Sequence, residues 1–247
     1  MLRWGDDLGN RKKGLRSTDS KHLDTEGLEL SNILREVRRP AQMADMPRRI
    51  KLSQRALELV SRQQNPTLWA ELQNGLANGL ARSPHGDRAD NIEQAVEHYR
   101  QALKVYTEKD FPIDWANTCS NLALTFANRI KGNRADNIEQ AIDYCIHALN
   151  VCIEKNSPKS WANIHGNLGL ICTKRIRGDR SENVEQSIYH CNQALKVCKK
   201  VDFFWASIQN NLSIAYIRRI KGERADNIEQ AIDHCRNPEG LHREGFP

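Results

Sequence analysis

One segment of ten residues reads Gly132-Asn133-Arg134-Ala135-Asp136-Asn137-Ile138-Glu139-Gln140-Ala141, and close copies of it begin at Gly86, Gly178 and Gly222. The four copies lie 46, 46 and 44 residues apart. Repetition with a period of about 20–50 residues is typical of arrays of stacked units, because one unit alone cannot bury its apolar face. We therefore predict an elongated repeat array rather than a closed globule.

A tryptophan marks the start of each unit. Trp115 opens a stretch in which apolar residues recur every three or four positions as far as Ile130, which is the pattern of one buried helix face. We expect Asp114 to cap this first helix. The other units begin with Trp69, Trp161 and Trp205.

The repeated segment is expected to open the second helix of each unit. Gly132 stands where a left-handed residue can end the first helix. Asp136 and Glu139 have the spacing of a capping box, in which both side chains bond backbone N–H groups of the first turn. An apolar face then continues at helical spacing through Ile138, Ala141, Ile142, Cys145, Ala148, Leu149 and Cys152.

Four parts of the chain follow from these boundaries. Residues 1–26 are polar and basic, and we expect them to be disordered. Residues 27–66 are expected to form N-terminal helices and a partial repeat, because 50–60 aligns with 96–106 one unit later. Residues 67–236 form the four-unit repeat domain, and 237–247 form an irregular tail.

The fourth unit is predicted to be incomplete. Pro238 stands where the preceding units have Ala148 and Ala194, and proline inside a helix costs roughly 3 kcal/mol, so the helix should stop near Arg236. This pattern suggests a truncated relative of a longer protein. We expect weak homodimerisation or fraying at this end, because the missing neighbour would expose Ile214, Ile228 and Ile232.

The composition limits the class of protein further. The net charge of +6 and the pI of about 9.0 are only mildly basic. The sequence contains neither a long apolar run nor a secretory leader pattern, so we expect a cytoplasmic protein without a membrane span. The seven cysteines are expected to be reduced thiols in the core.

The helix patterns resemble those of a known repeat family. The first helix contains Cys119-x-x-Leu122-Ala123-x-x-Phe126, and the second contains Ala141-x-x-x-Cys145-x-x-Ala148. This arrangement resembles the tetratricopeptide repeat, although that repeat usually has about 34 residues. A HEAT-like array, with about 40–47 residues per unit, is the competing architecture. The small residues at fixed helix positions favour the tetratricopeptide pattern.

The resemblance implies an all-α fold, an α-solenoid of stacked antiparallel helix pairs that forms a tetratricopeptide-like right-handed superhelix. The long form of the unit resembles bacterial repeat arrays that are associated with CHAT-type, caspase-like protease domains. The residues after 236 are too few for such a domain, so we expect the chain to lack it. The resemblance therefore implies a scaffold for protein–protein interaction, which could regulate a separately encoded protease or signalling partner.

In that family the first helices line the concave groove, where a peptide or protein partner would bind. Side-chain amides suit this task because each one offers donors and an acceptor. Equally, the ladder formed by Asn121, Asn167 and Asn211 could serve only to fix the helix packing, and both interpretations stay open. The resemblance places these residues in the groove: Asn117, Asn121, Leu124, Asn128, Asn163, Asn167, Leu170, Lys174, Asn210, Asn211, Ile214 and Arg218.

The loops between the helices carry a basic edge. It could bind nucleic acid, which is the alternative function, or it could be a solvated edge that neighbouring acids neutralise. Because no aromatic residues alternate with these cations, we favour the second interpretation and do not expect nucleic acid as the partner. The edge consists of Arg129, Lys131, Arg134, Arg175, Arg177, Arg180, Arg219, Lys221 and Arg224.

No catalytic residue, metal site or cofactor is predicted. Neighbouring helical residues such as His190 and Cys191 point about 100° apart, so they cannot face one ion together. The repeated acids stand at expected helix starts, where capping explains them without catalysis. We therefore expect a non-enzymatic protein.

Overall fold

The computed structural model describes residues 25–39, 43–198 and 203–236. The predicted disorder of residues 1–24 and the predicted irregular tail 237–247 lie outside this part of the chain. Residues 25 and 26, at the end of the segment that we expected to be disordered, are already helical. Within the described residues the fold is all-α.

The helices follow one another in pairs joined by short loops. A first helix covers residues 25–37 and is followed by the short 3-10 helix η1 (Met43–Asp45). The remaining helices are α2 (Met46–Leu59), α3 (Pro66–Arg82), α4 (Arg88–Leu103), α5 (Pro112–Phe126), α6 (Arg134–Val151), α7 (Pro158–Lys174), α8 (Arg180–Val197), α9 (Phe203–Arg218) and α10 (Arg224–Arg236).

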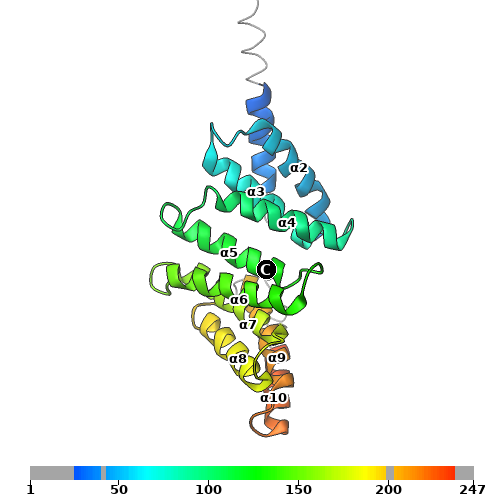
Figure 1. The fold of residues 1–247 in the computed structure, drawn as a ribbon, viewed down its shortest axis with the longest axis vertical. Helices are drawn as coiled ribbons and strands as arrows, with labels where there is room; N and C mark the ends of the chain where they lie inside the picture. Colours follow the sequence, from blue (N-terminus) through cyan, green and yellow to red (C-terminus); the bar gives the residue numbers. More distant parts are fainter. Residues whose placement is uncertain (1–24, 40–42, 199–202, 237–247) are drawn as a thin grey trace, which may run out of the picture.

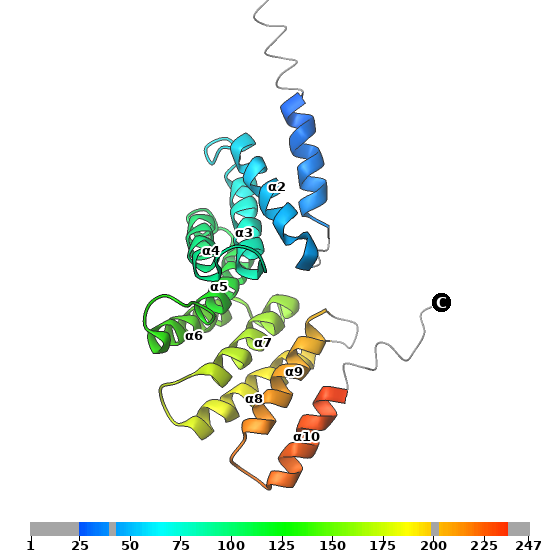
Figure 2. The ribbon, with the colours of Figure 1, turned by 90° about the vertical axis from the view of Figure 1, so that its right-hand side faces the viewer.

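The pairs stack into an α-solenoid, as predicted (Figure 1). We call the first helix of a pair helix A (α3, α5, α7, α9) and the second helix B (α4, α6, α8, α10). Each helix A packs against its own helix B, and α5, α7 and α9 also pack against the helix B of the preceding pair. The stack is curved and open on one side (Figure 2), and helices A contact one another, α5 against α7 and α7 against α9.

The helix of residues 25–37 is the helix A of a leading pair that ends with α2. Leu30-Ser31 and Leu34 match Leu122-Ala123 and Phe126, which lie 92 residues later, or two units of 46. Ile33 is buried, and Leu30 and Leu34 pack against the same cluster, together with Ala56 of α2 and Leu72 of α3. The N-terminal helices and partial repeat that we predicted for residues 27–66 therefore include a full helix pair.

Helix A begins earlier than predicted. α5 starts at Pro112, with Phe111 as its N-terminal cap residue, so Asp114 lies inside the first turn and the prediction that it caps the helix was wrong. Proline has no N–H to lose at the first position of a helix, and its fixed φ suits the helix. α3 and α7 have the same start, at Pro66 and Pro158, whereas α9 begins with Phe203.

Helix A also ends earlier than predicted, and the glycine that was expected to end it lies further on, in the loop before helix B. α5 ends at Phe126, so Ile130 lies in the loop and is 59% exposed, not part of a buried face. Gly132 does adopt a left-handed conformation with φ of 84°, as expected. It lies in the loop that turns into α6, however, and does not close α5.

Helix B is capped three residues before the predicted position. Asn133 accepts hydrogen bonds from the N–H groups of Ala135 and Asp136, whereas Asp136 itself lies within the first turn. Asp87 and Asp179 cap α4 and α8 in the same way. The predicted capping box of Asp136 and Glu139 does not form; instead, Asp136 bonds Arg177 and Glu139 bonds Arg175, both of the next unit.

The asparagine of the repeated segment fixes the loop before helix B. Asn137 is buried, and its amide donates to the carbonyl of Lys131 at 2.9 Å across the turn at Gly132. Asn91, Asn183 and Asn227 make the corresponding bond in the other units. The loop conformation therefore explains why all four copies have asparagine at this position.

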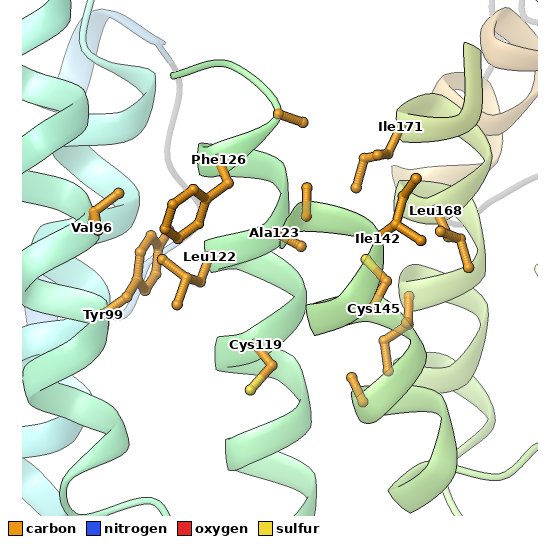
Figure 3. Close-up of a cluster of buried hydrophobic side chains, with 14 of the residues drawn as sticks. Val96, Tyr99, Cys119, Leu122, Ala123, Phe126, Ile142, Cys145, Leu168 and Ile171 are labelled. Carbon is orange, nitrogen blue, oxygen red and sulfur yellow. The ribbon is translucent and has the colours of Figure 1, made fainter. Parts of the chain in front are cut away.

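One continuous core runs through the inner units. Tyr99 of α4 and Leu122 of α5 meet on one side of α5, and Ile142 of α6 lies beside Leu168 and Ile171 of α7 (Figure 3). Each layer therefore uses apolar residues from two neighbouring pairs. Burial confirms the predicted role of Cys119, Cys145, Cys152, Cys172 and Cys191, whereas Cys198 is half-buried and Cys235 is exposed.

Candidate functional site

A cavity of about 810 Å³ lies on the concave side of the stack. Helices α3, α4, α5 and α7 and the loop between α3 and α4 supply most of its wall, and Phe204 of α9 also lines it. Six of the residues that line it were predicted from the sequence: Asn117, Asn121, Leu124, Asn128, Asn163 and Asn167. The structure thus brings six of the twelve predicted groove residues together in one site.

Three amides in this cavity have no partner within the described part of the protein. Asn117 and Asn121 lie one turn apart on α5, and Asn163 stands on α7 at the position of Asn117 one unit earlier. Their side chains make no hydrogen bond to any described residue, and all three line the cavity wall. Each one can therefore donate and accept hydrogen bonds toward a ligand.

Two other asparagines of the predicted ladder are used for packing. The amide of Asn167 donates to the hydroxyl of Ser120 at 2.9 Å, and the amide of Asn211 donates to the carbonyl of Gly166 at 3.4 Å. Both bonds join one helix A to the helix A before it. The ladder thus contains residues of two kinds, some of which fix the stack while others face the cavity.

Near the loops, polar side chains form hydrogen bonds between neighbouring helices A. Asn128 accepts a hydrogen bond from the ammonium group of Lys174 at 2.8 Å, one unit later. Arg218 donates to the carbonyl of Thr173 at 2.9 Å. Burial lowers the pKa of Lys174 because the charged ammonium group loses water. These contacts hold adjacent helices A at their ends and leave Asn128 accessible in the cavity wall.

Other predicted groove residues lie away from the large cavity. Leu170 and Asn211 line a smaller neighbouring cavity of about 70 Å³, which shares Leu124, Asn163, Asn167 and Phe204 with the first. Asn210 is exposed, and Ile214 is half-buried outside both cavities. The groove is therefore centred on α5 and α7, and α9 contributes less than expected.

The sequence prediction missed the contribution of the first unit. Asn78 and Arg82 of α3 line the cavity at the positions that Leu124 and Asn128 occupy 46 residues later. The repeat register could have identified both residues. Phe204 had no such signal, because the spacing before the fourth unit is two residues shorter than the others.

Most cations of the basic edge are paired with acids of the preceding unit. Arg129 forms a two-bond ion pair with Glu93, at 2.8 and 2.7 Å, and Lys131 bonds Asp90 at 2.9 Å. The same arrangement recurs one and two units later, in the pairs Arg175–Glu139, Arg177–Asp136 and Arg219–Glu185. The edge therefore joins neighbouring units electrostatically, and five of its nine cations are paired with acids.

The first arginine of helix B turns back onto its own helix A. Arg180 donates to the carbonyl of Thr173 at 3.0 Å, and Arg224 donates to the carbonyl of Ile217 at 2.6 Å. A cation there is favourable because the carboxyl end of a helix carries a partial negative charge. Arg134, at the same position of α6, and Lys221 are exposed.

A polar pair recurs between the two helices of a unit. His165 of α7 and His190 of α8 place their Nδ1 atoms 2.9 Å apart, so one nitrogen must donate and the other accept. The pKa of both imidazoles is lowered to about 4, chiefly by burial, and for His165 repulsion from the His190 ring contributes to that value. Both rings are therefore neutral at pH 7.

No group of histidine, cysteine and acidic side chains within the described residues could hold a metal ion. No described helix is both long enough and apolar enough to cross a bilayer. The sequence matches neither a protein-family model nor a curated protein.

Proposed function

We propose that this protein is a non-enzymatic scaffold that holds an extended peptide segment of a partner protein in the groove between α3, α5 and α7. The observation that carries the proposal is the set of three unpaired amides, Asn117, Asn121 and Asn163, in the wall of a cavity of about 810 Å³. Rigid helices position all three, so they are arranged for binding before a ligand arrives.

The chemistry of the wall suits a peptide backbone. Each residue of an extended chain offers one N–H and one C=O, and a carboxamide can pair with both. Asn117 and Asn121 are separated by about 5–6 Å, the distance between residues one turn apart on a helix face. That spacing is close to the roughly 6.6 Å between alternate residues of a strand. Apolar side chains of the peptide would contact Leu124 and Phe204.

The resemblance to tetratricopeptide arrays supports a narrower form of this function. A chain with Leu122-Ala123-x-x-Phe126 and its repeats would act as a binding arm for a separately encoded protease or signalling protein. Five buried free cysteines, including Cys119 and Cys145, fit a reducing compartment such as the cytoplasm.

A peptide-display selection on the full chain tests the proposal. Selected peptides should bind the wild type, and the triple variant Asn117→Ala, Asn121→Ala, Asn163→Ala should bind them at least about tenfold more weakly. The matched control is Asn150→Ala with Asn192→Ala, which removes exposed amides from helices B. Equal affinity for all three proteins, or a selection without any enriched peptide, would contradict the proposal.

A labelled single-stranded RNA is the counter-probe for the alternative function. Since Arg129, Arg175 and Arg219 are paired with acids, we expect no binding at about 0.15 M salt, where a weakly charged surface is screened. Salt-dependent binding that is lost in Lys131→Glu with Arg177→Glu would favour nucleic acid instead of a peptide.

A further inference from the structure

An interface with a glutamate–arginine ion pair at its edge is built three times along the stack. In each case the helix B of one pair is covered by the helix A of the next pair, α4 by α5, α6 by α7 and α8 by α9. Two apolar residues four positions apart lie on the covered face of α6, where Ile138 is 0% exposed and Ile142 is 8% exposed. Figure 3 shows Ile142 next to Leu168 and Ile171 of the covering helix α7.

A glutamate beside the apolar pair binds an arginine that follows the covering helix. Glu139 of α6 binds Arg175, which follows the end of α7, through two bonds of 3.0 and 2.8 Å. Glu93 and Glu185 bind Arg129 and Arg219 in the same way. Each of these three covering helices therefore carries apolar residues and, just beyond its carboxyl end, an arginine that pairs with the glutamate.

α10 carries a fourth copy of this face, and no described element covers it. Ile228 is 41% exposed and Ile232 is 42% exposed, although they correspond to Ile138 and Ile142. Glu229 corresponds to Glu139 and is exposed. Cys235 is exposed as well, whereas Cys145 and Cys191, at the same position in α6 and α8, are buried.

We propose that this face of α10 binds an amphipathic helix of a partner protein that has the chemistry of helix A. The helix would lay its apolar side on Ile228 and Ile232 and pair an arginine beyond its carboxyl end with Glu229. The interface differs from the concave groove, so the inference does not depend on the proposed peptide binding.

The residues of the leading helix argue against a second copy of this chain as the occupant. A head-to-tail contact would place the helix of residues 25–37 on α10. Val37 occupies the position of Arg129 in that helix, and the neighbouring Arg38 already pairs with Glu71 at 2.8 Å. A copy would therefore leave Glu229 without its cation.

The test uses the full chain and a peptide of residues 203–222, which is a natural helix A that includes Arg219 and lacks cysteine. We expect the peptide to bind and to slow alkylation of Cys235 at least about tenfold at saturation, as the covered thiols Cys145 and Cys191 imply. Glu229→Arg should weaken binding at least about tenfold, and a peptide with Arg219→Glu should restore it.

Asp233→Arg is the matched control for charge. Asp233 is exposed on the same helix, and its counterparts Glu97 and Asp143 stay exposed although their helices are covered. It should leave peptide affinity within about twofold of the wild type. Equal loss in both variants, or no binding of the peptide, would overturn the proposal. So would a free protein in which Cys235 already reacts as slowly as the buried thiols, or a dimer that Ile232→Asp dissociates.

Discussion

Helices α6 and α10 have nearly the same sequence at their amino ends, but their surroundings differ. Ile138 of α6 is 0% exposed, whereas Ile228, its counterpart in α10, is 41% exposed. The difference arises because α7 covers α6 and no described element covers α10. Burial in this fold is therefore decided by the neighbouring unit as much as by the residue itself, as expected for a linear array.

The largest expected difference between the two helices is the cost of removing these side chains. Ile138→Ala should lower the free energy of unfolding by about 2–5 kcal/mol, because it leaves a cavity in a packed core. Ile228→Ala removes the same atoms from a site that solvent already reaches, so we expect less than about 1 kcal/mol. Urea denaturation of both variants measures the difference. Equal losses would mean that α10 is covered in solution.

Substitution of the loop glycines by alanine creates the same backbone strain in an inner unit and in the terminal unit, so the two variants can be compared. Gly132→Ala forces alanine into a left-handed conformation with φ of 84°, which costs about 1–2 kcal/mol. Gly222→Ala creates equal strain at φ of 78°. If α10 unfolds separately from the rest of the stack, Gly222→Ala should lower the hydrogen-exchange protection of α10 and leave the global urea midpoint nearly unchanged. A full shift of that midpoint would show that α10 unfolds with the rest.

The ion pairs between units should contribute a smaller effect. A double-mutant cycle on Glu139→Ala and Arg175→Ala should give a coupling of about 0.5–1 kcal/mol, because the pair is bidentate but still about one-quarter exposed. Glu229→Ala, at the uncovered counterpart, should change stability by less than about 0.3 kcal/mol. Thermal and urea unfolding at low and high salt provide the check, and a coupling near zero would contradict this role.

The last comparison applies only below neutral pH and concerns a buried histidine pair. The folded-state pKa of His165 and of His190 is about 4, below the ordinary value of 6.5, so the unfolded chain binds protons first as pH falls. The stability from this pair is complete above about pH 6.5 and is lost as pH falls toward 4. His165→Gln copies the Gln209–His234 pair of the terminal unit and should reduce the loss of stability between about pH 7 and 5. An unchanged pH dependence would exclude the pair as its source.

The repeat pattern predicted the fold because it is a property of the sequence itself. Copies of Gly132 and of the Ile138 face identify units, and stacking follows from them. The helix starts were predicted less well, since Asn133 and Asp136 are both suitable caps and only the three-dimensional loop selects one. Pro112, at the first position of α5, was the signal that the pattern of apolar residues obscured.

The candidate site could be predicted only as a helix face. The spacing placed Asn121 and Asn167 at equivalent positions, but it could not show which amide remains unpaired. Asn167 reaches Ser120 in the preceding helix A, whereas Asn74, which occupies the place of Ser120 one unit earlier, bonds Thr118. The neighbour at each step therefore determines whether an asparagine fixes the stack or faces the cavity.

Native-state hydrogen exchange, resolved by peptide, tests the stacked arrangement most directly. Amides of α6 and α8 should exchange slowly, with protection close to that of global unfolding, because α7 and α9 cover them. Amides of α10 should exchange at least about 100-fold faster, which corresponds to a difference in opening free energy of about 2.7 kcal/mol. Protection of α10 equal to that of α8 would contradict the account.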